Sequence, residues 1–125
     1  MSTTREWMDE ADRRLDDAEM LHERGRYARA ISACYYAVLA AGKGALKAKG
    51  VEVSSHKALR VHLGKVFIRH GDLPNDTAAF LEELYKDRLQ ADYELAGFSA
   101  EDSSGVIAEV DRRINRFAAL LEEAG

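Results

Sequence analysis

The sequence predicts an all-α fold, an up-and-down bundle of four long helices with one shorter helix attached. Two observations support this prediction. Proline occurs once in 125 residues, at Pro74, while alanine, leucine, glutamate, arginine and aspartate dominate, which favours helices over strands. Apolar residues also recur at three- and four-residue intervals, the spacing of one helical face. A chain of this length is expected to form one domain over residues 1–125.

Capping signals and apolar spacing mark the first two helices. Thr3 and Glu6 have the spacing of a capping box, and the apolar positions that follow predict a helix that continues until Gly25. The second helix is predicted from about residue 27 to 49, with Gly50 just beyond its end. It is the longest apolar helix, so we expect it at the centre of the bundle.

The same signals mark three further helices. A third helix, capped by Ser54 or Ser55, is expected to reach about His70. A fourth is expected from about residue 76 to 95 or 96, and a fifth, capped by Ser99, runs to the C-terminus. Because the links between the long helices are short, neighbouring helices are expected to be antiparallel.

Composition and charge exclude some classes of function. The chain has one cysteine, Cys34, which cannot form an internal disulfide, and no apolar run has the length of a membrane span or a secretory signal. We therefore expect a cytoplasmic protein with no membrane partner. The net charge of −4 argues against bulk attraction to nucleic acid but leaves room for a local basic patch.

One stretch of the sequence is locally basic. Residues 54–71 contain lysines, arginines and histidines but no acidic residue. On an α-helix His62, Lys65 and Arg69 would fall within about 60° of one another, as a cationic strip suited to phosphate. The alternative is a solvated face that balances the acidic first helix.

Two opposite charges stand within an apolar pattern in "KDRLQADYEL", residues 86–95. Arg88 and Asp92 are four residues apart, and helical angles place both on the same side as Leu81 and Leu84. Desolvating such a pair costs several kcal/mol per ion. The pair therefore either locks the core or lines a polar cleft, and the sequence leaves both interpretations open.

Two adjacent tyrosines stand in the second helix. Tyr35 falls in the centre of the apolar stripe and Tyr36 points about 100° to its side. A buried tyrosine hydroxyl needs a hydrogen-bond partner. Either both are core or interface aromatics, or Tyr35 contacts Arg88 or Asp92 across the bundle.

Other catalytic signatures are incomplete. Glu19 and His22 form an ExxH pair, but a ferritin-like metal centre needs two such pairs and further glutamates. There is no glycine-rich phosphate loop, and no serine or cysteine nucleophile can be assigned a base. We therefore expect neither a metal nor a cofactor.

Three segments together resemble a known family. They are "GRYARAISACYYAVLAAGKGAL" (25–46), "SHKALRVHLGKVFIRHGDLP" (55–74) and "RLQADY" (88–93). In this order they are similar to the small prokaryotic HEPN-domain proteins. The resemblance implies a helical bundle that forms a homodimer, and many such proteins are metal-independent ribonucleases of toxin-antitoxin and defence systems, often beside a minimal nucleotidyltransferase.

The chain departs from the motif of the active family members. In those members an arginine is followed, after four to six residues, by a histidine. Arg88 matches the arginine, but Tyr93 stands where one form of the motif has its histidine, and no histidine follows His70. Ala33 and Ala40 likewise replace an arginine and a histidine that the family often carries. Tyrosine, with a pKa near 10, transfers protons poorly at neutral pH.

Three functions remain consistent with the sequence. The first is binding of RNA or a nucleotide, as the toxin-like half of a pair with a minimal nucleotidyltransferase. The second is a metal-independent ribonuclease with a divergent site of Arg88, Asp92 and Tyr93. The third is a non-enzymatic dimeric interaction module in which Arg88 and Asp92 are a structural ion pair. The candidate binding residues are Tyr35, Tyr36, His62, Lys65 and Arg69.

Overall fold

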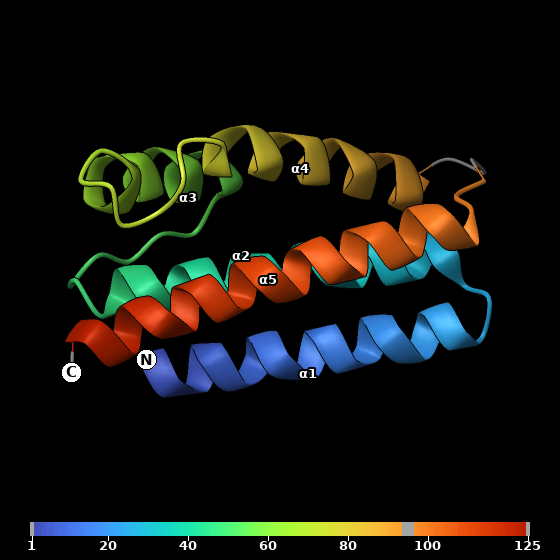
Figure 1. Ribbon diagram of the computed structural model, residues 1–125, viewed down its shortest axis with the longest axis horizontal. Coiled ribbons are helices and arrows are strands. Elements are labelled where there is room, and N and C mark those ends of the chain that lie inside the picture. The colour runs from blue at the N-terminus through green and yellow to red at the C-terminus, as the bar shows by residue number, and fades with distance from the viewer. Residues whose placement is uncertain (1, 94–96, 125) are drawn as a thin grey trace.

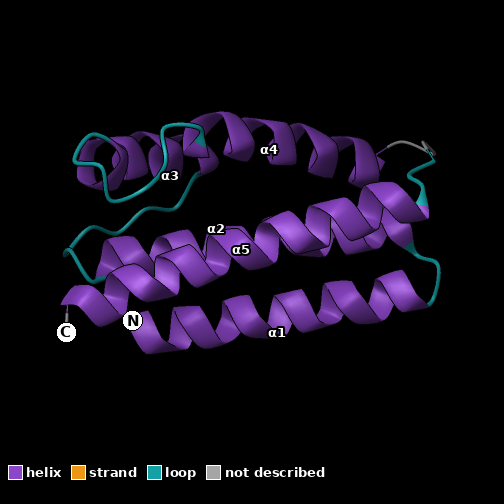
Figure 2. Ribbon diagram, in the orientation of Figure 1, coloured by secondary structure: helices purple, strands orange, loops and turns teal. Residues whose placement is uncertain are grey.

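The computed structural model describes residues 2–93 and 97–124, and within them it contains helices and no strand (Figures 1 and 2). Four helices are long and one is short, so the predicted all-α bundle is confirmed. The short helix α3 continues directly into a π-helix, η1. The elements are α1 (Thr4–Glu23), α2 (Tyr27–Lys47), α3 (His56–Leu63), η1 (Gly64–Ile68), α4 (Thr77–Tyr93) and α5 (Ala100–Ala124).

Helix α2 lies at the centre of the bundle, as the sequence predicts. It packs against α1, α5, α4 and α3, and along the chain the four long helices alternate in direction (Figure 1). Small residues on α2 allow close approach. A Cβ atom on Gly42 would lie 2.8 Å from a methyl carbon of Leu59, so α3 packs where only glycine leaves room. The core joins all five helices through Ala11, Ala18, Cys34, Val38, Leu46, Leu59, Leu63, Leu81, Leu84, Val110, Ile114 and Phe117.

The predicted helix ends are largely confirmed. Thr3 and Glu6 form a reciprocal capping box, and the Ser55 hydroxyl accepts a hydrogen bond from a backbone N–H of α3. Gly25, which follows α1, has a φ angle of 75°. Gly50, which precedes the link to α3, has a φ angle of 76°. Glycine adopts this left-handed conformation without strain. Helix α2 ends slightly earlier than expected, at Lys47.

The third helix differs from the prediction. It was expected to be regular to about His70, but α3 ends at Leu63 and the chain then forms the π-helix, in which the Arg69 N–H donates to the Gly64 carbonyl over 2.9 Å. Each turn of a π-helix contains an additional residue. The α-helical angles that aligned His62 with Lys65 and Arg69 therefore do not hold.

Helix α4 begins at Thr77, and its expected end at Leu95 or Ala96 lies outside the described residues.

None of the helices within residues 2–93 and 97–124 combines the length and apolarity that crossing a membrane requires.

Candidate functional site

The guanidinium of Arg88 lies among three tyrosine rings where α4 packs on α2. Its Cζ atom is 5.0 Å from the ring centre of Tyr35, 5.7 Å from that of Tyr36 and 5.2 Å from that of Tyr85. The electron-rich faces of these rings attract the cation. We call Arg88, Asp92 and these tyrosines the arginine cluster.

Asp92 closes the solvent side of the arginine cluster. Its Oδ2 accepts a hydrogen bond of 2.9 Å from Arg88 Nη1, and its Oδ1 accepts one of 2.8 Å from the Ser32 hydroxyl. The side chain of Arg88 is 15% exposed and that of Asp92 is 28% exposed. The pair thus lies at the edge of the core, with the arginine turned inward and the carboxylate at the rim.

The guanidinium of Arg88 has nitrogen atoms that donate to no described residue. Arginine has five N–H donors, and here only Nη1 is used, by Asp92 and by the Tyr36 hydroxyl at 3.4 Å. Nε is buried without a hydrogen-bond partner among the described residues. Nη2 makes no hydrogen bond to them either and is not among the buried atoms. Nη2 is therefore the guanidinium nitrogen that is left for a ligand.

Arg88 remains charged at this site. Burial alone would lower its pKa, but the negative potential of Tyr36 and the hydrogen bond to Asp92 outweigh burial, so its pKa is raised. The site therefore presents a permanent cation in a partly desolvated, aromatic environment.

His56 connects the arginine cluster to α3. Its Nδ1 lies 3.1 Å from the Tyr35 hydroxyl and its Nε2 lies 2.8 Å from Glu82. One tautomer satisfies both contacts, because Nε2–H can donate to the carboxylate while Nδ1 accepts from the hydroxyl. The imidazole also stacks on Tyr85, with ring centres 4.1 Å apart and planes 15° apart. The hydrogen bond from His56 lowers the pKa of Glu82.

Burial makes Tyr35 a hydrogen-bond donor rather than a base. Loss of solvent raises its pKa to about 12, although the charge of Arg88 acts in the opposite direction. Its hydroxyl is therefore neutral near pH 7. The chain of contacts from Glu82 through His56 to Tyr35 fixes the ring against which Arg88 rests.

A groove adjoins the arginine cluster on the side of α1. Its volume is about 740 Å³, and it lies between α1, α2 and α4. Tyr36 and Asp92 belong to both the cluster and the groove, so the two form one continuous surface. The groove is lined by Arg14, Asp17, Met20, Leu21, Arg24, Ala28, Arg29, Ser32, Ala33, Tyr36, Ala91, Asp92 and Tyr93.

The structure brings together four of the candidate residues from the sequence. Tyr35, Tyr36, Arg88 and Asp92 are in contact, and both interpretations of Tyr35 hold, because its ring is part of the buried core and also contacts Arg88 across the bundle. Tyr93 lies apart on the edge of the groove, with 78% of its surface exposed.

The cationic strip predicted on the third helix is not part of this site. His62 is on α3, Lys65 is in the π-helix and Arg69 follows it. Lys65 and Arg69 are exposed, and none of the three contacts the arginine cluster through a hydrogen bond or ion pair within the described range. The π-helix changes the helical angles on which the predicted strip depends.

Sequence reasoning missed two members of the site. Tyr85 stands three residues before Arg88 and therefore on the same side of α4, so helical spacing was a sufficient signal. His56 directly follows the predicted cap Ser55, but its partners Tyr35 and Glu82 come from other helices. No spacing in the sequence indicates those contacts.

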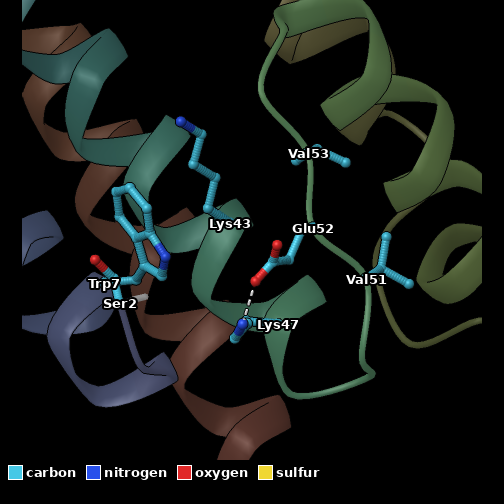
Figure 3. Close-up of a pocket in the computed structure, with 7 residues that line it drawn as sticks. All are labelled: Ser2, Trp7, Lys43, Lys47, Val51, Glu52 and Val53. Carbon is cyan, nitrogen blue, oxygen red and sulfur yellow. Dashed lines mark hydrogen bonds and ion pairs between the residues drawn. The ribbon is translucent and has the colours of Figure 1, made fainter.

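A smaller pocket lies where the first turn of α1 meets the last turns of α2 and the link that follows α2 (Figure 3). Its volume is about 180 Å³, and Lys43 lies over the ring of Trp7, 4.9 Å from its centre. Lys47, the other cation, is paired with Glu52. With both cations already engaged, this pocket is a weaker candidate than the arginine cluster.

No group of three or more potential metal ligands is found within residues 2–93 and 97–124. The ExxH histidine, His22, instead has its Nδ1 atom 2.9 Å from the hydroxyl of Ser103, which is buried. The contact joins α1 to α5. It gives this histidine a structural partner.

No curated protein sequence matches the chain significantly. The family model of the HEPN domain, however, matches residues 4–120, a range that includes α1 to α4, most of α5 and the whole arginine cluster. Because the match spans nearly all of the 125 residues, the chain belongs to the HEPN domain family.

Proposed function

We propose that this HEPN domain binds RNA or a nucleotide through the arginine cluster. The observation that carries the proposal is the guanidinium of Arg88, held among three tyrosine rings with Nη2 making no hydrogen bond to any described residue. The planar fork of an arginine binds phosphate oxygens with charge-assisted hydrogen bonds. Beside it the ring of Tyr36, which is 36% exposed, offers a stacking surface for a base. Membership of the HEPN family, whose domains have nucleotide- and RNA-related roles, supports the same ligand class.

A second arginine of the same chain, Arg113, has all of its nitrogens bound by carboxylates. Arg113 is 14% exposed, close to the value for Arg88, and it lies over the ring of Phe80. Nη1 and Nη2 both bind Asp76 at 3.0 Å, and Nε binds Glu109 at 3.2 Å. All three nitrogens of Arg113 are thus occupied by carboxylates. Arg88 uses one, which supports a binding role over a purely structural one.

Binding is a better supported role than cleavage. The position of the motif histidine is occupied by Tyr93, and Tyr35 is neutral with a pKa of about 12. Neither tyrosine is suited to proton transfer near neutral pH. A divergent ribonuclease site of Arg88, Asp92 and Tyr93 is the second candidate. It is favoured by one observation, the carboxylate of Asp92 held 2.9 Å from the guanidinium.

The family resemblance supports two proposals about partners. We infer that the chain forms a homodimer, and that it is the toxin-like half of a pair with a minimal nucleotidyltransferase. The third candidate, a non-enzymatic dimeric interaction module, would need the same homodimer but no ligand at Arg88. Sedimentation velocity of the pure chain tests the homodimer, and co-purification with a nucleotidyltransferase from the adjacent reading frame tests the pairing.

Binding of labelled RNA, followed by fluorescence anisotropy, tests the proposed function. Wild type is expected to bind, and Arg88→Met is expected to lose affinity by about 10- to 100-fold, because a hydrogen bond to a charged group contributes about 1.5–3 kcal/mol. Arg113→Met is the matched control, with similar exposure but no contact with the cluster. Equal affinity in wild type and Arg88→Met would refute the proposal.

Incubation of total RNA with the protein and a metal chelator tests the ribonuclease alternative. Cleavage by wild type that disappears in Arg88→Met and persists in Arg113→Met would establish catalysis at this site. If wild type binds RNA but releases no fragments at any protein concentration, the alternative is ruled out and the binding function stands.

A further inference from the structure

We infer that the ligand of this site is a single-stranded polynucleotide, with one phosphate at Arg88 and the adjoining nucleotides along the groove between α1, α2 and α4. The inference rests on the proposed function and goes further in two respects. It assigns binding residues on α1 and α2 outside the arginine cluster, and it distinguishes a strand from both a mononucleotide and a duplex.

The groove continues directly from the arginine cluster. The Tyr36 ring is shared, because the guanidinium of Arg88 and that of Arg14 both lie 5.7 Å from its centre. Asp92 and Ser32, which hydrogen-bond to each other, also line the groove. A strand whose phosphate is held by Arg88 would therefore pass Tyr36 on its way into the groove.

The groove carries positive charge on a protein whose net charge is −4. Arg14, Arg24 and Arg29 line it, and Arg24 and Arg29 are exposed and form no ion pair with any described residue. Arg14 is already paired with Glu10. Of the two lining carboxylates, Asp92 is occupied by Arg88 and Ser32, which leaves Asp17. Uncommitted guanidinium groups along a groove attract successive phosphates.

The groove also gathers exposed aromatic surface. In the part of the chain that the structure describes, the exposed large hydrophobic residues are Met20, Tyr36 and Tyr93, and all three line this groove. Tyrosine rings next to arginines are the usual stacking surfaces for unpaired bases. In a duplex the base faces are already stacked on one another, so only an unpaired strand can use these rings.

The size of the groove agrees with a short segment of strand. Its volume of about 740 Å³ falls within the range of about 300–1,000 Å³ that ligand sites in proteins occupy. The arginine cluster, by contrast, offers a single guanidinium, that of Arg88. A mononucleotide would engage that guanidinium and leave Arg24, Arg29 and Tyr93 without a role.

The test compares the affinities of three probes: an oligouridylate of about eight nucleotides, uridine monophosphate, and a duplex of the same length as the oligouridylate. A length of about eight nucleotides is within the range that single-strand binding sites cover. Tyr93→Ala is expected to weaken binding of the single strand about tenfold, because it removes one stacking surface. Arg29→Gln is expected to weaken it several-fold and to reduce the slope of log affinity against log salt by about 0.7, the value for one phosphate contact on a single strand.

Controls separate this inference from the proposed function. Arg5→Gln, on an exposed arginine outside the groove, should bind like wild type, and neither groove variant should change the affinity for uridine monophosphate. If Arg88→Met abolishes binding but both groove variants bind the single strand normally, the inference is wrong and the proposed function stands. Failure of wild type to bind any of the three probes overturns both.

Two further outcomes would also overturn the inference. Equal affinity for duplex and single strand would mean that the tyrosines do not stack on bases. If instead Tyr93→Ala dissociates a dimer in sedimentation velocity and leaves the RNA affinity unchanged, the groove is occupied by a second copy of the chain and not by nucleic acid.

Discussion

Replacing Arg88 by methionine makes a quantitative prediction about stability that distinguishes a ligand site from a core lock. Methionine retains most of the apolar packing of the arginine stem but removes the charge. The change breaks the hydrogen-bonded ion pair with Asp92 and the contacts of the guanidinium with the three tyrosine rings. The contact with the Tyr36 hydroxyl, at 3.4 Å, is too long to add much.

The expected cost follows from the exposure of the two partners. Ion pairs that water can reach contribute about 0.2–1 kcal/mol, and the Asp92 side chain is 28% exposed. A partly exposed cation over aromatic rings adds about 0.5–1 kcal/mol. Asp92 keeps its hydrogen bond from Ser32 after the substitution, so it is not left as an unpaired buried charge. We therefore expect the free energy of unfolding to fall by about 1–2 kcal/mol.

Urea denaturation of wild type and Arg88→Met, followed by circular dichroism, measures this difference. A loss of about 3–5 kcal/mol, the cost of breaking a fully buried pair, would refute the reasoning and identify Arg88 as a structural lock. The matched variant Arg113→Met should lose a similar amount, because Asp76 is 68% exposed and Glu109 keeps its hydrogen bonds from Arg112. A much larger loss in Arg88→Met than in Arg113→Met would also contradict the interpretation.

Three further predictions concern the core. The pKa of the Tyr35 hydroxyl is about 12 in the folded protein and about 10 in an unfolded chain. The neutral hydroxyl therefore stabilises the folded state below about pH 10, and this contribution is lost as the pH rises toward 12. Urea denaturation from about pH 9 to 11 should show a steeper loss for wild type than for Tyr35→Phe, and parallel curves would count against it. The thiol of Cys34, buried with a pKa of about 12, should react with a disulfide reagent only on unfolding; rapid labelling of the folded protein would show otherwise. Leu59→Ala should lower the free energy of unfolding by about 2–5 kcal/mol. Gly42→Ala should cost less stability in the Leu59→Ala background than in wild type, since its new methyl group would meet Leu59 at 2.8 Å. Additive costs in a double-mutant cycle would disprove this crowding.

Regular features of the fold were predictable from the sequence because they depend on local interactions. The capping box at Thr3, the cap at Ser55 and the glycine that ends α1 act on residues within one turn of themselves. The central place of α2 follows from its apolar character alone. The π-helix after α3 was not predicted, since the same residues fit an α-helical pattern and nothing local indicated the extra residue in the turn.

The candidate site was only partly predictable. Helical angles placed Arg88 toward the core and Tyr35 in an apolar stripe, and the resemblance named the segments that contain both. A contact of Tyr35 with Arg88 or Asp92 was one of two alternatives that the sequence left open, and neither Tyr85 nor His56 was predicted to take part. The stacking of His56 on Tyr85 and its hydrogen bonds to Tyr35 and Glu82 join residues of three different helices, and the relative rotation of those helices is set by packing of the whole core.

By itself the sequence determined the helical class, most of the helix ends and the family, because periodicity, caps and motif order are properties of the chain. The tertiary structure decided the surroundings of Arg88 and therefore which role it can have. It shows that Asp92 uses only part of the guanidinium, that three tyrosines hold it, and that a groove with Arg24 and Arg29 opens beside it. These relations depend on how α1, α2 and α4 pack, because a shared surface among separate helices forms only when the core fixes their positions.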